Sequence, residues 1–186
     1  MYFLFSLFCV NNVICMKIFR FLLVLCGTLF ASMGLAGEID GMRFIHIGLE
    51  EGLSHSTIFG INQDKEGNLW FATYDGFNKY DGYNFTVYRH QYKNPKSIAS
   101  DITRCVVIDN DNRIWIGTRE GLSLYNHRKN EFSNFFYKKK GQNVTVRNIV
   151  PMQKDWLMLG TTEGILLFDV KGERFLNDTL SATLHS

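Results

Sequence analysis

The sequence is poor in proline, cysteine and charge. Of its 186 residues, 2 are proline and 4 are cysteine, and charged side chains make up 20%. A disordered chain carries more charge and fewer apolar residues than this one, which is 46% hydrophobic and 15% aromatic. The chain therefore has the material for a packed core. Its 16 glycines, set among many aromatic residues, favour short strands joined by tight turns, so we expect an all-β fold.

Acidic residues are missing from the first 36 positions, where Lys17 and Arg20 are the only charged side chains. These two basic residues are followed by the apolar run 21–30, which is too short to span a bilayer. A basic segment followed by a short apolar run is typical of a secretory signal peptide.

The small residues Gly34 and Ala36 place the expected cleavage after residue 36, so we predict a signal peptide over 1–36. Met16 is the expected true start, which makes 1–15 an upstream extension. An uncleaved membrane anchor and a lipoprotein signal ending at Cys26 are the alternatives. We expect the protein to be exported to the periplasm.

Cysteine and net charge are lacking in the part that follows the expected signal peptide. Three of the four cysteines, Cys9, Cys15 and Cys26, lie in the segment to be removed, so Cys105 remains alone and no internal disulfide can form. Cleavage also removes two of the 20 basic residues and leaves 18, which equals the number of acidic residues. Nothing in this balance points to nucleic acid or to an anionic membrane surface as a partner.

Catalytic and metal-binding motifs are also missing. The five histidines occur singly, without a second ligand at metal-binding spacing. The sequence contains no G-x-S-x-G, no glycine-rich phosphate loop, and neither the phospho-accepting segment nor the ATP-binding boxes of a histidine kinase. We therefore expect no catalytic residue, no metal and no cofactor in this chain.

An internal repeat is the strongest signal that the sequence does contain. Residues 69–81 (LWFATYDGFNKYD) align with residues 114–126 (IWIGTREGLSLYN) at an offset of 45, and residues 157–169 (LMLGTTEGILLFD) follow at an offset of 43. Upstream, residues 53–64 match residues 98–109 at the same offset of 45. Each unit holds four short apolar runs separated by turn residues, which is typical of a four-stranded propeller blade.

The predicted fold is a partial β-propeller of about three four-stranded antiparallel blades, arranged as an open arc and not as a complete ring. The expected segments are an N-terminal strand at 37–52 that would close a propeller, blade 1 at 53–97, blade 2 at 98–142 and an incomplete blade 3 at 143–186. Because closed propellers need at least four blades, we expect the chain to be a truncated gene product or a fragment. Such a chain should be poorly soluble or oligomeric when it is made alone.

Certain residues recur at equivalent positions of the units, and we interpret them as structural. Each Gly ends a hairpin bend where a positive φ is expected, and each Trp lies on a strand covered by the neighbouring blades. The structural set is Trp70, Thr73, Gly76, Tyr80, Trp115, Thr118, Gly121, Tyr125, Thr161, Gly164 and Phe168.

The pattern D-x-x-G-x-[LI]-W-[FI]-[AG]-T-x-x-G-[LF]-x-x-Y-[DN] runs from Asp64 to Asp81 and again from Asp109, with Asn112 in place of Gly. It resembles the two-component regulator propeller repeat over about 53–169. The third unit departs from the pattern at its first turn, where methionine and aspartate stand in place of Asp and Gly.

The resemblance implies a periplasmic ligand-sensing segment of a hybrid histidine kinase of the kind abundant in gut Bacteroidetes. Full-length relatives are anchored in the inner membrane and pass ligand occupancy to a kinase. The implied ligand is an oligosaccharide released from a polysaccharide, and the implied partners are the remaining propeller blades, the kinase and a second copy in the full-length protein.

A binding surface is expected where the loops between blades meet the bends between the second and third strands of each blade. Basic and aromatic residues there could meet an acidic glycan, although solvated loop charges are the alternative interpretation. The candidate ligand-binding residues are Tyr74, Asp75, Tyr92, Lys93, Lys96, Arg119, Glu120 and Lys139. The alternative functions are a secreted propeller enzyme, similar to a lyase or quinoprotein, and a protein-binding adaptor with an apolar loop face.

Overall fold

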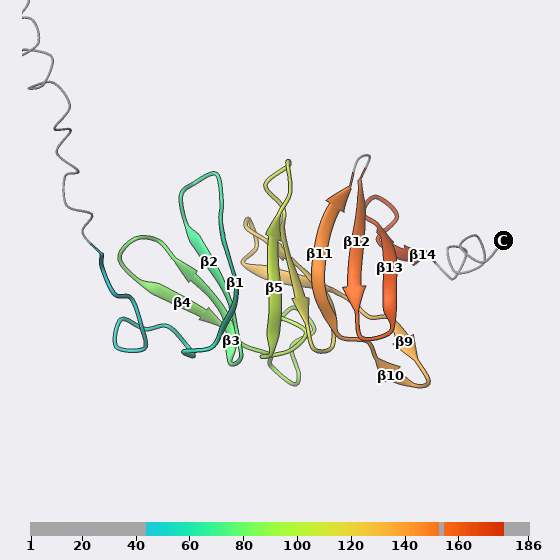
Figure 1. Cartoon of the computed structure of the whole chain (residues 1–186), viewed down its shortest axis with the longest axis horizontal. Helices are drawn as coiled ribbons and strands as arrows, with labels where there is room; N and C mark the ends of the chain where they lie inside the picture. Colours follow the sequence, from blue (N-terminus) through green and yellow to red (C-terminus); the bar gives the residue numbers. More distant parts are fainter. Residues whose placement is uncertain (1–43, 153–154, 177–186) are drawn as a thin grey trace, which may run out of the picture. The chain divides into compact units, whose positions relative to one another are not determined.

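The computed structural model describes residues 44–152 and 155–176. All described strands belong to one compact unit, His46–Ser186, and form three four-stranded antiparallel sheets and one two-stranded hairpin (Figure 1). The described residues contain no helix, and the three sheets do not close into a ring. The prediction of an all-β partial propeller is confirmed. The expected signal peptide, 1–36, lies outside the described residues.

Each sheet follows the chain in a simple up-and-down order. The first sheet consists of β1 (Ile58–Gln63), β2 (Leu69–Thr73), β3 (Gly76–Tyr80) and β4 (Phe85–Tyr88). The second consists of β5 (Thr103–Ile108), β6 (Ile114–Thr118), β7 (Gly121–Asn126) and β8 (Glu131–Phe135). The third consists of β11 (Val146–Met152), β12 (Trp156–Thr161), β13 (Gly164–Asp169) and β14 (Arg174–Leu176). The hairpin is formed by β9 (Lys138–Lys139) and β10 (Gln142–Asn143).

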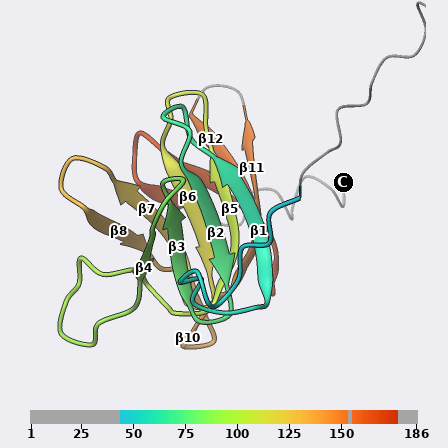
Figure 2. The same ribbon diagram turned by 90° about the vertical axis from the view of Figure 1, so that its left-hand side faces the viewer.

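The sheets stack face to face, and their first strands lie along the same edge, with β5 between β1 and β11 (Figure 2). One core cluster lies between the first two sheets, where Trp70 and Phe77 pack with Val106 and Ile116. A second cluster lies between the second and third sheets, and its members include Trp115 and Phe168. These side chains are nearly or fully buried because each sheet covers the face of the next.

The turn between the first two strands of each sheet keeps one backbone conformation although its sequence changes. Gly67, Asn112 and Asp155 occupy the same repeat position and have φ values of 88°, 62° and 62°. Glycine adopts this left-handed region freely, and Asn and Asp are the side chains that tolerate it best. The departure in the third repeat therefore preserves the positive φ of the turn.

A threonine shapes the bend between the second and third strands of every sheet. The hydroxyls of Thr73, Thr118 and Thr161 donate to the glycine carbonyl three residues later, at 2.8, 3.0 and 2.7 Å. At Gly121, φ is 145° and an added Cβ would lie 2.5 Å from the carbonyl oxygen of Phe135, so the position has no room for a side chain. The two residues between each Thr and Gly are held at the tip of the bend, which is where several candidate ligand-binding residues lie.

Two features differ from the simple blade pattern. The loop between the second and third sheets forms the β9–β10 hairpin, whose turn residues Lys140 and Gly141 have φ values of 53° and 81°; such a turn matches the twist of paired strands. Residues 44–52, part of the segment expected to close a propeller, form turns and no strand. Among the described residues, the structure has no helix that is long and apolar enough to cross a membrane.

Candidate functional site

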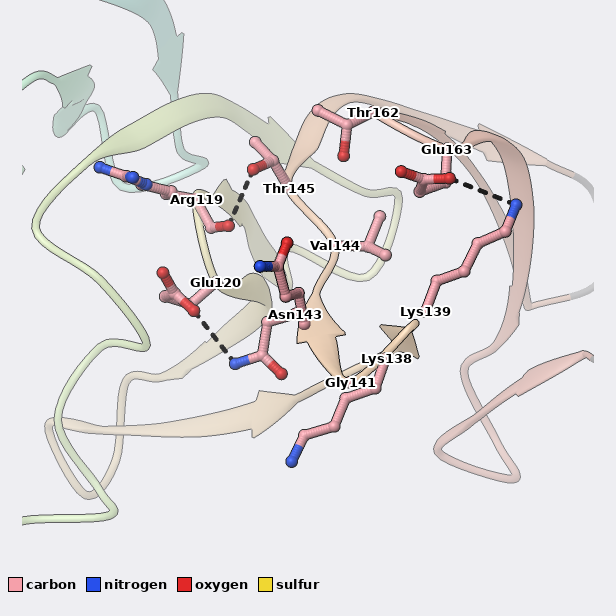
Figure 3. A pocket seen from close by; sticks show the side chains of 11 residues that line it. Arg119, Glu120, Lys138, Lys139, Gly141, Asn143, Val144, Thr145, Thr162 and Glu163 are labelled. Carbon is pink, nitrogen blue, oxygen red and sulfur yellow. Dashed lines mark hydrogen bonds and ion pairs between the residues drawn. The ribbon is translucent and has the colours of Figure 1, made fainter.

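A polar hollow of about 580 Å³ lies between the second and third sheets (Figure 3). The β6–β7 bend, the β9–β10 hairpin with the residues that follow it, and the β12–β13 bend form its walls. Its lining residues are Arg119, Glu120, Lys138, Lys139, Gly141, Gln142, Asn143, Val144, Thr145, Thr162 and Glu163.

Hydrogen bonds tie the first wall of the hollow to the hairpin segment. The Asn143 side-chain amide donates to the Glu120 carboxylate at 3.1 Å, and the Thr145 hydroxyl donates to the Arg119 carbonyl at 2.9 Å. The amide of Thr162 donates to the carbonyl of Thr145 at 3.1 Å. These backbone and side-chain hydrogen bonds join the β6–β7 bend to residues 143–145 and residues 143–145 to the β12–β13 bend, so the separation of the two bends is fixed.

Charges of both signs surround the hollow. Lys139, on the β9–β10 hairpin, forms an ion pair of 3.3 Å with Glu163, at the β12–β13 bend, and both side chains are about half exposed. Figure 3 shows that Lys138 and Lys139 point in opposite directions and that the Arg119 side chain points away from Asn143. The interior of the hollow is thus dominated by Asn143, Glu120, Glu163 and Lys139, which offer both hydrogen-bond donors and acceptors.

Asn143 carries an unused acceptor in this hollow. Its Oδ1 is buried and has no hydrogen-bond partner among the described residues. The orientation of the amide is fixed because its nitrogen must face the acidic oxygen of Glu120. A buried acceptor without a donor costs free energy, and because protein atoms cover this oxygen, a ligand hydroxyl or amide would reach it only after a shift of the side chain.

Three of the predicted ligand-binding residues, Arg119, Glu120 and Lys139, meet at this hollow. Tyr74 and Asp75 lie at the β2–β3 bend of the first sheet. Tyr74 is 48% exposed. Asp75 forms an ion pair of 3.0 Å with Arg89.

The β4–β5 loop carries three more residues of the predicted set, Tyr92, Lys93 and Lys96, and none of them lines the hollow. The Tyr92 side chain is 93% exposed. Lys96 forms an exposed ion pair of 2.9 Å with Glu131. The structure therefore divides the predicted set into a clustered part and a scattered part.

A second cavity, of about 370 Å³, is lined by Phe59, Arg104 and Arg147. These side chains come from β1, β5 and β11, the strands at the shared edge of the three sheets. None of them was predicted from the sequence as a site residue. The signal was available, since the three positions are separated by the repeat offsets of 45 and 43.

Two buried carboxylates, Asp64 and Asp109, have pKa values lowered by hydrogen bonds within their own sheets. Burial acts to raise the pKa of Asp64, but hydrogen bonds from Trp70 and Asn68 outweigh it and hold the pKa below 3.8. Burial likewise opposes ionisation of Asp109, whose pKa is lowered by hydrogen bonds from Trp115 and Arg113. These carboxylates are structural, because their oxygens face the indoles and the turn. Within the described residues, no group of three His, Cys, Asp or Glu side chains is placed to hold a metal ion.

Three stacked sheets of four antiparallel strands, each built from one sequence repeat, define a segment of a β-propeller. A family model described as "Two component regulator propeller" matches residues 52–75 and 97–120. The chain therefore carries repeats of the two-component regulator propeller type.

Two further similarities agree with this assignment. The chain is 37% identical over 70 residues to histidine kinase P4 of Formosa agariphila, a match that covers 38% of the chain and 5% of the kinase. It is also similar to the extracellular domain of a hybrid two component system from B. thetaiotaomicron, with 32% identity, a TM-score of 0.64 and coverage of 74% of the chain and 20% of that domain.

The extracellular domain of a one component system from B. thetaiotaomicron shares the fold at 19% identity and a TM-score of 0.59. That match covers 73% of this chain and 18% of the other. The chain thus spans about a fifth or less of the length of each of these three relatives. It is homologous to part of the extracellular domain of a hybrid two-component system.

Proposed function

We propose that this chain is part of the extracytoplasmic ligand-sensing propeller of a hybrid two-component signalling protein, and that the polar hollow binds a carbohydrate breakdown product. Its similarity to an extracellular domain of such a system supports the sensing role. In this proposal the chain itself is not an enzyme. The remaining blades and the kinase of a longer protein would carry the signal across the membrane.

The polar lining of the hollow is the observation that carries the ligand class. A sugar offers several hydroxyls that both donate and accept, and the hollow matches them with the Glu120 and Glu163 carboxylates and the Lys139 ammonium. A protein-binding surface would offer an apolar patch, whereas charged and amide side chains dominate this lining. The site therefore suits a polyol better than an apolar segment of a partner.

Titration of the purified chain with a panel of neutral and acidic oligosaccharides tests this assignment. We expect Asn143→Ala and Glu120→Gln to weaken binding of the recognised sugar by about tenfold each, since each removes a hydrogen bond worth roughly 1–1.5 kcal/mol. Lys129→Ala, in the exposed β7–β8 turn, is the matched control and should leave the affinity unchanged. Failure of every sugar to bind, or equal affinity of Asn143→Ala and wild type, would refute the assignment.

The periplasm is the proposed location, because similar domains are extracellular parts of signalling systems. We expect the mature protein to begin near Gly37 and to be recovered in the periplasmic fraction. N-terminal sequencing of fractionated protein checks this. Recovery of protein that still carries residues 17–36 would favour an uncleaved anchor over a signal peptide.

A further inference from the structure

The first strand of each sheet, β1, β5 or β11, has a bulge at its second residue. The pairing of β1 with β2 shifts between Ile58 and Gly60, and equivalent shifts flank Arg104 in β5 and Arg147 in β11. Phe59, Arg104 and Arg147 therefore have no residue directly opposite them on the neighbouring strand. Bulges re-aim a side chain, and these three point into one cavity of about 370 Å³.

The two arginines have no anionic partner of their own. Neither Arg104 nor Arg147 forms an ion pair with any carboxylate in the ranges 44–152 and 155–176. The Arg104 guanidinium lies over the Phe59 ring at 4.7 Å from its centroid. Its Nε is buried and has no hydrogen-bond partner.

This arrangement leaves one buried donor, the Arg104 Nε, without an acceptor, and it leaves the partly buried Arg104 and the exposed Arg147 without a carboxylate partner. Stacking on Phe59 holds the plane of the Arg104 guanidinium in place but uses none of its N–H groups. A buried donor that has lost water and gained no acceptor destabilises the protein, and a second positive charge on the same cavity favours an anion there. An oxyanion between the two arginines would accept hydrogen bonds from their terminal N–H groups and would compensate their charge.

We infer that Phe59, Arg104 and Arg147 form a binding site for a carboxylate or sulfate group, separate from the polar hollow. A planar guanidinium presents two parallel donors that fit either group in a bidentate manner. The exposed part of the Phe59 ring, which is 39% exposed as a residue, offers an apolar surface for the body of a ligand that carries the anion. None of these three residues lines the hollow, so this site would hold an anion whatever the hollow binds.

Equilibrium dialysis of the purified chain against radiolabelled inorganic sulfate, glucuronate and glucose tests the site. We expect saturable binding of one anion per chain, with glucose unbound at the same concentrations. Arg104→Gln and Arg147→Gln should each weaken anion binding at least tenfold, and Arg104→Lys, which keeps the charge and loses the fork, should weaken it less. Arg128→Gln, in the exposed β7–β8 turn, is the control and should bind as wild type does.

The outcomes separate the sources of the anion and the two sites. Binding of glucuronate alone assigns a carboxylate on a sugar ring, binding of sulfate alone assigns a sulfate group, and binding of both assigns the shared oxyanion chemistry. Asn143→Ala should leave anion binding intact, so a failure of the hollow is distinguishable from a failure of this site.

Near-UV circular dichroism verifies that each variant is folded. If a glutamine variant unfolds, the Arg104→Lys and Phe59→Leu variants test the site in its place, and each should bind the anion more weakly than wild type. Absence of saturable anion binding, or equal weakening by Arg128→Gln, would overturn the inference.

Discussion

The indole Nε1 of Trp70 donates a 2.8 Å hydrogen bond to Oδ2 of Asp64, and Trp115 repeats this bond to Asp109 at 2.9 Å. Each pair joins the second strand of a sheet to the turn that precedes it. In the third repeat both partners are replaced by methionine: Met158 stands in place of the Trp, and Met152 stands in place of the Asp. The two residues therefore act as one structural unit: a buried indole N–H needs an acceptor, and a buried carboxylate needs donors.

Replacement of Trp115 by alanine should destabilise the fold strongly. Trp115 is 1% exposed and lies in the cluster between the second and third sheets, so its removal leaves a cavity and takes one of the hydrogen-bond donors from Asp109. We expect a loss of about 3–5 kcal/mol of unfolding free energy. Urea denaturation followed by far-UV circular dichroism measures it. Lys139→Ala, which removes a half-exposed ion pair, should cost less than about 1 kcal/mol, and similar midpoints for the two variants would contradict the core role of Trp115.

The carboxylate of Asp109 should make stability fall in acid. Burial opposes its charge, but the hydrogen bonds from Trp115 and Arg113 hold the folded pKa below 3.8. A lowered folded pKa gives a contribution that is present above the unfolded pKa and is lost as the pH falls through the folded pKa. Asp109→Asn should therefore be less stable than wild type by about 1–3 kcal/mol at neutral pH, with the difference shrinking below about pH 4.

Denaturation midpoints over a pH series compare Asp109→Asn with Asp111→Asn. Asp111 shares the partner Arg113 at 3.2 Å, but its side chain is 69% exposed. Its replacement should shift stability by less than about 1 kcal/mol at every pH. A constant gap between Asp109→Asn and wild type from neutral to acid pH would show that the Asp109 charge does not contribute as described.

Gly121→Ala should be more harmful than Gly141→Ala, although both glycines have a positive φ. At Gly121 an added Cβ would lie 2.5 Å from the Phe135 carbonyl oxygen, whereas at Gly141 nothing lies within 4 Å. The left-handed conformation costs an alanine about 1–2 kcal/mol at either position, and the clash adds to this only at Gly121. Thermal unfolding of the two variants measures the difference. Equal losses would mean that the β7–β8 pair moves aside without cost.

The sequence repeat predicts the sheets well because each strand is determined locally, by an apolar run between turn residues. The positions of Trp70 and Trp115 within the core follow from that pattern, since a strand covered on both faces is apolar. The β9–β10 hairpin and the buried acceptor of Asn143 depend on contacts between sheets, which one repeat does not encode. For Arg104 and Arg147, the repeat offset shows that the two positions are equivalent, but alternation along a strand does not show that a bulge turns both side chains into one cavity.

Cys105 should be unreactive in the folded chain. It is a free cysteine on β5, 9% exposed, in the cluster between the second and third sheets. Burial raises the pKa of its thiol to about 12, an effect that a hydrogen bond from the Gly117 backbone opposes only in part. At about pH 8 the thiolate, which is the reactive form, is then roughly one part in ten thousand, and the sulfur is also shielded from the reagent by the surrounding side chains.

We expect iodoacetamide to leave Cys105 unmodified in the native chain and to alkylate it readily in concentrated guanidinium chloride. Mass spectrometry of the tryptic peptide that contains Cys105 distinguishes it from the three other cysteines of the chain. Alkylation of that peptide at the same rate with and without denaturant would show that the interface between the second and third sheets opens on the timescale of the reaction.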